Sequence, residues 1–122
     1  VLTGVIWGLW HAPLIVMGYE YGGRLPAAAG IALFTCLCAG LGTLLSWLRV
    51  RSGSVLPAAI THGAFNAFAS LPAILVAPGD GLDLVLVGLI GWPAVVLFGL
   101  LAVLLLSGSW AGRTGAGQGT PS

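Results

Sequence analysis

Charged residues are scarce in this sequence: lysine is absent, and four arginines and three acidic residues make up the 6% of charged positions among 122 residues. Soluble domains devote about 25% of their positions to charged side chains. Hydrophobic residues account for 58% of the chain, and the mean hydropathy is +1.08. This composition excludes an ordinary soluble domain and predicts an integral membrane protein. The arginines form no basic block to bind a phosphate backbone, so nucleic acid is not an expected partner.

Cysteine is scarce as well. The two cysteines, Cys36 and Cys38, stand two positions apart in an apolar stretch. On a helix such a pair points to roughly opposite sides, which suits neither a disulfide nor a shared metal ion. We therefore expect both thiols to serve as small packing groups.

Long apolar runs dominate what is present. A helix needs roughly 20 apolar residues to cross a hydrocarbon core of about 30 Å, and four stretches approach that length. They cover residues 1–18, 25–48, 54–77 and 84–106. The predicted fold is all-α: a polytopic transmembrane helix bundle of about four spans, in one membrane domain over residues 1–106. Residues 107–122 are rich in Gly, Ser and Thr without an apolar period, which predicts a disordered polar tail.

The arginines predict an orientation in the membrane. Arg49 and Arg51 lie in the second connection and Arg113 in the tail, whereas the third connection carries Asp80 and Asp83. Positive residues concentrate in cytoplasmic connections. We therefore expect a multi-pass protein of the plasma membrane with its second connection and its C-terminus in the cytoplasm.

The N-terminal end of the sequence is unusual. Val1 stands inside an apolar run, without an initiator Met and without the basic region that opens a signal peptide. We expect the sequence to be a fragment of a longer chain.

Two polar motifs interrupt the apolar stretches. Trp7 precedes His11 by four positions, and His62 precedes Asn66 by four, so each pair shares one face of a helix. A polar side chain that faces lipid is costly, so both pairs are expected to face the interior of the bundle. A lone intramembrane histidine often serves only as a hydrogen-bonding link between helices. Two histidines, each with a partner one turn away, favour a functional site.

Prolines and small residues accompany the motifs. Pro13 lacks an N–H, so the first helix should kink or loosen within a turn of His11. Gly4 and Gly8 form a GxxxG step, which allows close approach of a second helix. Pro93 should bend the fourth span near its middle.

The residues around both motifs resemble signatures of the CPBP intramembrane protease family, which comprises CAAX-prenyl endopeptidases and bacteriocin-processing or immunity (Abi) proteins. The segment 3–14 resembles the second signature, an aromatic residue four positions before a histidine, with Trp7 where the family normally has Phe. The segment 54–66 resembles the third, His-x-x-x-Asn or His-x-x-x-Asp. The order of the two signatures also agrees.

The resemblance implies hydrolysis of a peptide bond inside a bacterial membrane. In such an enzyme a glutamate activates water, while histidines and Asn bind metal or stabilise the oxyanion. It therefore implies His11, His62 and Asn66 as catalytic residues and Trp7 as a wall of the cavity. A divalent metal such as zinc is a candidate cofactor, with His11 and His62 as its candidate ligands, although its requirement stays open. The expected partners are membrane lipid and a membrane-associated peptide, either prenylated or of bacteriocin type.

One signature of the family is missing from these residues. Glu-Glu-x-x-x-Arg, which supplies the glutamate, should precede His11, and it does not occur in the 122 residues. Glu20 and Arg24 have Glu-x-x-x-Arg spacing but follow His11, and Gly22 and Gly23 predict a turn between them. We expect that pair to form an ion pair within a loop.

Two other interpretations remain open. A non-catalytic membrane module with the same fold would act by binding a partner such as a peptide toxin. A haem protein would use one histidine from each of two helices as axial ligands. The haem interpretation predicts a sharp absorption band and no requirement for Asn66.

Overall fold

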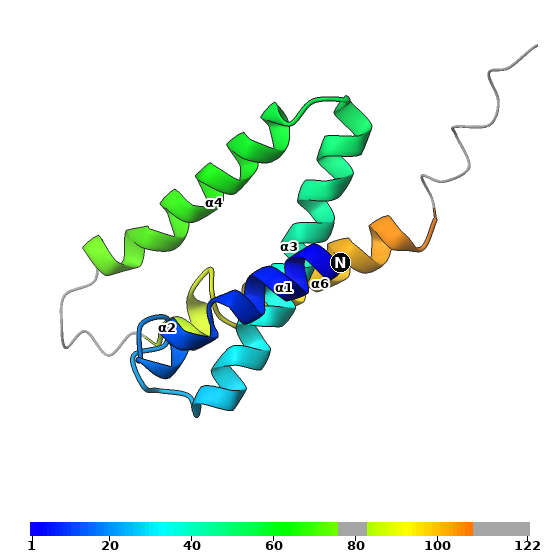
Figure 1. Cartoon of the computed structure of the whole chain (residues 1–122). Coiled ribbons are helices and arrows are strands. Elements are labelled where there is room, and N and C mark those ends of the chain that lie inside the picture. The colour runs from blue at the N-terminus through cyan, green and yellow to red at the C-terminus, as the bar shows by residue number, and fades with distance from the viewer. Residues whose placement is uncertain (76–82, 109–122) are drawn as a thin grey trace, which may run out of the picture.

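The computed structural model describes residues 1–75 and 83–108, and within these ranges every regular element is a helix. The all-α prediction is therefore confirmed. The elements, seen in Figure 1, are α1 (Leu2–Trp10), α2 (Ala12–Val16), α3 (Ala27–Ser52), α4 (Leu56–Leu75), α5 (Leu84–Val87) and α6 (Trp92–Leu106). The predicted tail lies outside the described residues from position 109 onward, as does Asp80 of the third connection.

The central element of the bundle is α3, a helix of 26 residues. It packs against α1, α6 and α4, and its middle supplies the most deeply buried side chains, Leu37, Cys38 and Leu41, each at most 2% exposed. In Figure 1, α1 and α6 cross α3 near its midpoint, while α4 turns back from the end of α3 and diverges from it. A left-handed Gly53 (φ 67°) ends α3 and allows this reversal of the chain.

Glycines set the separation of α1 and α3. Gly4 and Gly8 are both buried, and both face the backbone of α3. A methyl group on Gly4 would collide with the carbonyl of Cys38 and would lie 2.7 Å from Cα of Ala39. On Gly8 it would lie 2.5 Å from Cα of Thr35. The GxxxG step therefore brings the two helix backbones into direct contact, as in close-packed membrane helices.

The first predicted span is two short helices. The expected break near His11 is confirmed: α1 ends after nine residues at Trp10, and α2 begins at Ala12 and contains only five. Pro13 lies in the first turn of α2, where its missing N–H removes no hydrogen bond from the helix. Residues 1–18 thus form a broken segment in which polar backbone adjoins His11.

The fourth predicted span is also interrupted, and in place of the expected bend at Pro93 the helix breaks directly before it. A break at 88–91 separates α5 from α6, and Pro93 stands in the first turn of α6. Proline is well suited to that position, so here it begins a helix. By length and composition, two segments of the described chain can cross a membrane: α3 and Val85–Leu106. The number of about four spans stays a prediction.

We predict that Gly4→Ala destabilises the protein by about 1–3 kcal/mol, because the added methyl must push α1 away from α3. Gly99→Ala is the matched control, since nothing lies within 4 Å of the added group and alanine favours a helix. Thermal unfolding in detergent, followed by circular dichroism, compares the two. Equal unfolding temperatures for both variants would show that the glycine contact does not limit stability.

Candidate active site

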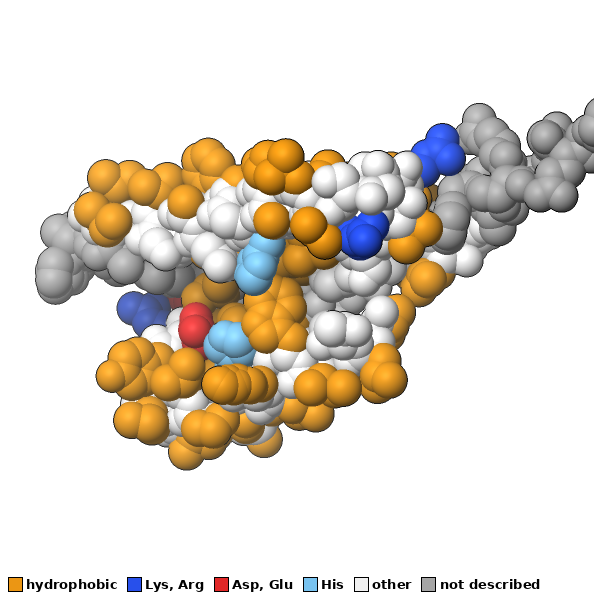
Figure 2. Space-filling view, turned by 45° about the horizontal axis from the view of Figure 1, so that its top comes forward, with side chains coloured by type: hydrophobic (Ala, Val, Ile, Leu, Met, Phe, Trp, Pro, Cys, Tyr) orange, Lys and Arg blue, Asp and Glu red, His pale blue; other side chains and the backbone are white. Residues whose placement is uncertain are grey.

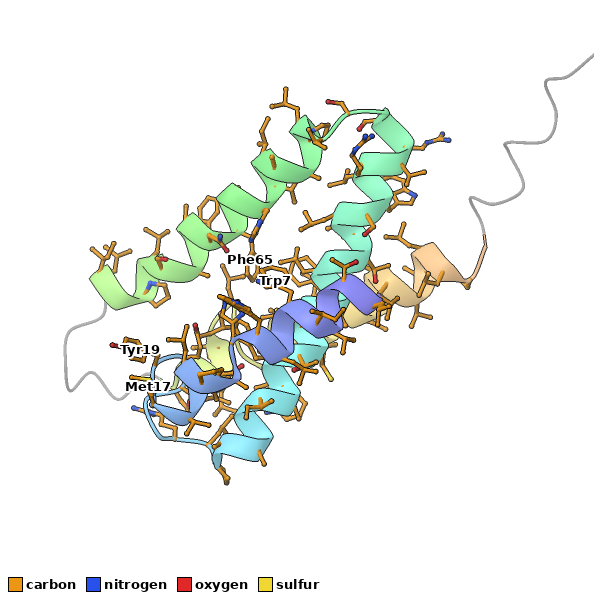
Figure 3. All side chains as sticks on the ribbon, viewed as in Figure 1. Trp7, Met17, Tyr19 and Phe65 are labelled. Atoms are coloured by element: carbon orange, nitrogen blue, oxygen red, sulfur yellow. The ribbon has the colours of Figure 1, made fainter. Side chains whose placement is uncertain are left out.

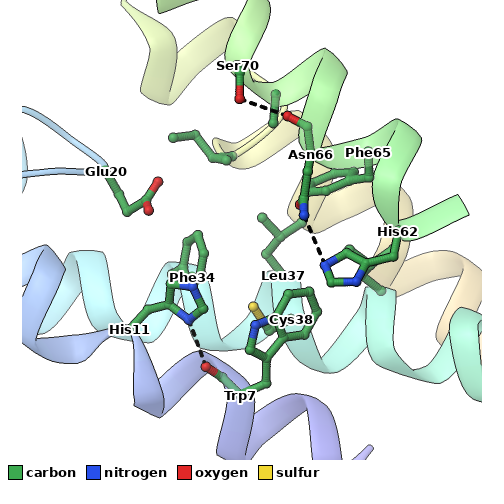
Figure 4. A pocket seen from close by; sticks show the side chains of 13 residues that line it. Trp7, His11, Glu20, Phe34, Leu37, Cys38, His62, Phe65, Asn66 and Ser70 are labelled. Carbon is green, nitrogen blue, oxygen red and sulfur yellow. Dashed lines mark hydrogen bonds between the residues drawn. The ribbon is translucent and has the colours of Figure 1, made fainter. Parts of the chain in front are cut away.

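The two polar motifs line one pocket of about 330 Å³ between α1, α3 and α4. Figure 2 shows a hollow in the surface with the two imidazoles on opposite sides of it. The structure therefore brings all four predicted site residues, Trp7, His11, His62 and Asn66, to the same cavity. The other lining residues are Glu20, Phe34, Leu37, Cys38, Leu41, Phe65, Ala69, Ser70 and Ile90 (Figure 4).

The tautomer of His11 follows from its hydrogen bond. Its Nδ1 lies 2.9 Å from the carbonyl oxygen of Trp7. A carbonyl only accepts, so Nδ1 carries the hydrogen, and in the neutral ring Nε2 keeps a lone pair. The ring packs against Phe34, with the ring centroids 4.9 Å apart. His11 therefore presents a hydrogen-bond acceptor at this wall of the pocket.

The second motif offers hydrogen-bond donors, in contrast to the acceptor of His11. On α4, the Asn66 amide nitrogen lies 3.2 Å from Nε2 of His62. The amide N–H donates and Nε2 accepts, so the neutral His62 ring carries its hydrogen on Nδ1. The backbone carbonyl of Asn66 accepts from the Ser70 hydroxyl at 2.9 Å. This wall of the pocket thus offers N–H donors: His62 Nδ1 and the second amide hydrogen of Asn66.

An indole connects the two walls. The ring centroid of Trp7 lies 6.1 Å from that of His11 and 4.9 Å from that of His62, edge-on in both cases. Figure 3 shows Trp7 and Phe65 extending into the same central space, whereas the exposed Met17 and Tyr19 point away from it. The indole occupies space that a haem held between the two imidazoles would need. The geometry therefore disfavours the haem interpretation.

Glu20 corrects one prediction from the sequence. The expected ion pair with Arg24 is wrong, because the Arg24 guanidinium lies 3.6 Å from the Asp83 carboxylate. The half-buried Glu20 side chain lines the pocket instead (Figure 4). Its place depends on the path of the loop after α2, and the spacing of residues along the chain carried no signal of that path.

The loop that presents Glu20 is firmly held. The neighbouring Tyr21 is only 7% exposed, and its hydroxyl donates to the Ile90 carbonyl at 3.0 Å. Burial, and secondarily the charge of Glu20, raise the pKa of the Tyr21 hydroxyl above its usual range, so it remains a donor at neutral pH. The loop turns through Gly18, Gly22 and Gly23, all at positive φ, which favours glycine.

The pocket does not fit a zinc site with three protein ligands. Across residues 1–75 and 83–108, no three His, Cys, Asp or Glu side chains are close enough together to hold a metal ion. Cys38 lines the pocket but is 2% exposed and belongs to the core, while Cys36 is exposed, and both are free thiols. Metal ligation by His11 and His62 therefore stays a prediction.

The fold and site define an all-helical protein with two apolar segments long enough for a membrane and a pocket that joins two His motifs. The profile of the family described as type II CAAX prenyl endopeptidase Rce1-like matches residues 1–68, more than half of the chain. The chain belongs to this family of proteases and is a membrane protein. The match contains both motifs and Glu20. No curated protein and no solved structure was found to match the chain.

We predict that Tyr21→Phe lowers the free energy of unfolding by about 1 kcal/mol, because the Ile90 carbonyl loses its partner. Tyr19→Phe is the matched control, since Tyr19 is 70% exposed. Thermal unfolding in detergent measures both. A loss of similar size in Tyr19→Phe would show that the Tyr21 hydrogen bond is not the cause.

Proposed function

We propose that this chain carries the substrate-activating part of a CAAX-type intramembrane endopeptidase, with His11, His62 and Asn66 as catalytic residues. One observation carries the proposal: a hydrogen-bond acceptor at the junction of α1 and α2 and a pair of N–H donors on α4 line one pocket. Hydrolysis of a peptide bond needs both, since water must lose a proton while the carbonyl oxygen gains negative charge.

His11 is placed to act on the water. Its Nε2 lone pair accepts a hydrogen bond from the water, which orients the water oxygen toward the scissile carbonyl carbon. As the oxygen–carbon bond forms, the water proton passes to Nε2 of His11, and from there to the leaving nitrogen as the carbon–nitrogen bond breaks. The products are a carboxylic acid and an amine, so atoms and charge balance. The hydrogen bond from Nδ1 to Trp7 keeps the ring in this tautomer.

His62 and Asn66 are placed to stabilise the oxyanion. The Nδ1–H of His62 and the free amide hydrogen of Asn66 are the donors of the opposite wall. Donors that are already oriented when charge develops lower the barrier more than freely reorienting water does. The glutamates of the family's first signature do not occur within residues 1–122, and no role in this chain is assigned to them.

The setting of the site suggests the class of substrate. The pocket is walled by Trp7, Phe34 and Phe65 and adjoins the apolar surfaces of the helices. We propose a membrane-associated peptide, prenylated or of bacteriocin type, cleaved by a multi-pass protein of the plasma membrane. Arg49 and Arg51, in the last turn of α3, support a cytoplasmic position for the connection to α4 and for the C-terminus.

We predict that His11→Ala, His62→Ala and Asn66→Ala each lower peptide cleavage at least about 100-fold, because each removes one interaction with the water or the oxyanion. The assay uses the native full-length protein in proteoliposomes, with any sequence that precedes Val1 retained. Thr61→Ala is the control on the same helix. Its hydroxyl donates to the Pro57 carbonyl and is not part of the pocket lining, so cleavage should persist.

The same variants distinguish a protease from a binding module. If cleavage persists in both histidine variants while they insert normally into the membrane, the catalytic assignment is wrong. A non-catalytic module would retain its biological effect in His11→Ala. A protease would lose both peptide cleavage and its biological effect in the same variant.

A further inference from the structure

The pocket contains one fixed charge that the proposed hydrolytic roles do not use. Among its lining residues Glu20 is the only carboxylate, and no lysine or arginine lines the pocket with it. A carboxylate beside apolar walls is costly unless a cation or several donors face it.

The nearest basic residue along the chain does not supply that cation. Arg24 lies four positions after Glu20, but its guanidinium pairs with Asp83, 3.6 Å away. Arg49 and Arg51 belong to the last turn of α3 and are absent from the pocket lining. Within residues 1–75 and 83–108, therefore, the arginines are directed elsewhere.

Two long-range contacts fix the loop on the C-terminal side of this carboxylate. Directly after Glu20, the buried Tyr21 donates to the Ile90 carbonyl, and three residues later Arg24 pairs with Asp83. Both partners lie near α5, so the loop is tied to a distant part of the chain. The tyrosine ring also packs against Gly30, where an added methyl would lie 3.0 Å from the ring. The loop backbone that carries Glu20 is thus held in place before a ligand arrives.

We propose that Glu20 gives this pocket a preference for peptides that carry a lysine or arginine side chain close to the bond to be cleaved. The inference rests on the proposed function and adds a specificity determinant to the same site. A substrate ammonium or guanidinium group supplies the missing positive charge and forms a charge-assisted hydrogen bond with the carboxylate. A peptide with an apolar side chain there leaves the carboxylate desolvated and unpaired, so it binds less well.

A peptide cation suits the site better than a metal ion. Glu20 and the two histidines line one cavity but do not form a three-ligand group. A side-chain ammonium group needs only one carboxylate and a few acceptors, and it brings its own flexible stem into the cavity.

The test compares two farnesylated CAAX peptides that differ at one residue before the farnesylated cysteine, lysine in one and norleucine in the other. Both are cleaved by the full-length protein in proteoliposomes, and kcat/KM is measured for each. We expect the wild-type protein to favour the lysine peptide by on the order of tenfold. In Glu20→Gln the ratio should fall toward one, and in Glu20→Asp, which keeps the charge, it should stay above one.

Tyr19→Phe, next to Glu20 but exposed, is the control and should keep the wild-type ratio. In Glu20→Lys the charge at this position is reversed. This variant should therefore cleave a third peptide, with aspartate in place of the peptide's lysine, more efficiently than the lysine peptide. An unchanged ratio in Glu20→Gln overturns the proposal. So does an equal loss for both peptides, which would place Glu20 in the hydrolytic step instead.

Binding measurements separate this proposal from the proposed function. Equilibrium binding of the same two peptides is measured with the protein in lipid nanodiscs, without reference to cleavage. If the lysine peptide binds more tightly and this preference disappears in Glu20→Gln, the charge preference stands even where no cleavage occurs, and the hydrolytic function fails. If the protein cleaves both peptides without any preference for lysine, the proposed hydrolytic function is supported and the proposed role of Glu20 is wrong.

Discussion

The contact between the backbones of α1 and α3 is the constraint on which the site depends. A nine-residue helix is too short to be stable alone, so α1 derives its position from packing. Gly4 and Gly8 form the stripe that touches α3, and Trp7 and His11 form the adjacent stripe, about 60° around the helix. Because the glycines hold α1 against α3, the neighbouring stripe faces the pocket beside it. The glycines thus position the wall of the pocket that carries Trp7 and His11, without lining the pocket themselves.

The helix break at His11 sets the chemistry of that wall. In a continuous helix, the backbone N–H of residue 11 would bond to the carbonyl of Trp7. Here the His11 N–H bonds to Gly8 at 3.1 Å, and the Trp7 carbonyl accepts from the histidine ring instead. Pro13, in the first turn of the next helix, is compatible with this break. A proline two residues after the histidine therefore favours a defined tautomer, and with it a lone pair directed at the pocket.

Local sequence rules predicted what depends on local structure. The membrane composition, the break near His11, the GxxxG contact and the shared face of His62 and Asn66 all follow from spacing and from proline and glycine chemistry. The position of Glu20 does not, because it depends on a turn through three glycines and on a hydrogen bond between Tyr21 and a residue 69 positions away. Such a contact leaves no periodic pattern in the sequence. The start of α6 could not be predicted either, because a proline can bend a helix or begin a new one.

The two walls of the pocket are joined by side chains. The wall with His11 is fixed by backbone contact, whereas α4 packs chiefly on α3 near the reversal of the chain. Farther along α4, ring contacts connect it to the rest: Trp7 with His62 at 4.9 Å, and Phe65 with Phe98 of α6 at 5.6 Å. The separation of acceptor and donors therefore depends on both ring contacts, one of which is made by the aromatic side chain at position 7. Where the family signature normally has phenylalanine, the larger indole of this chain contacts both histidines, so this residue joins the two halves of the site.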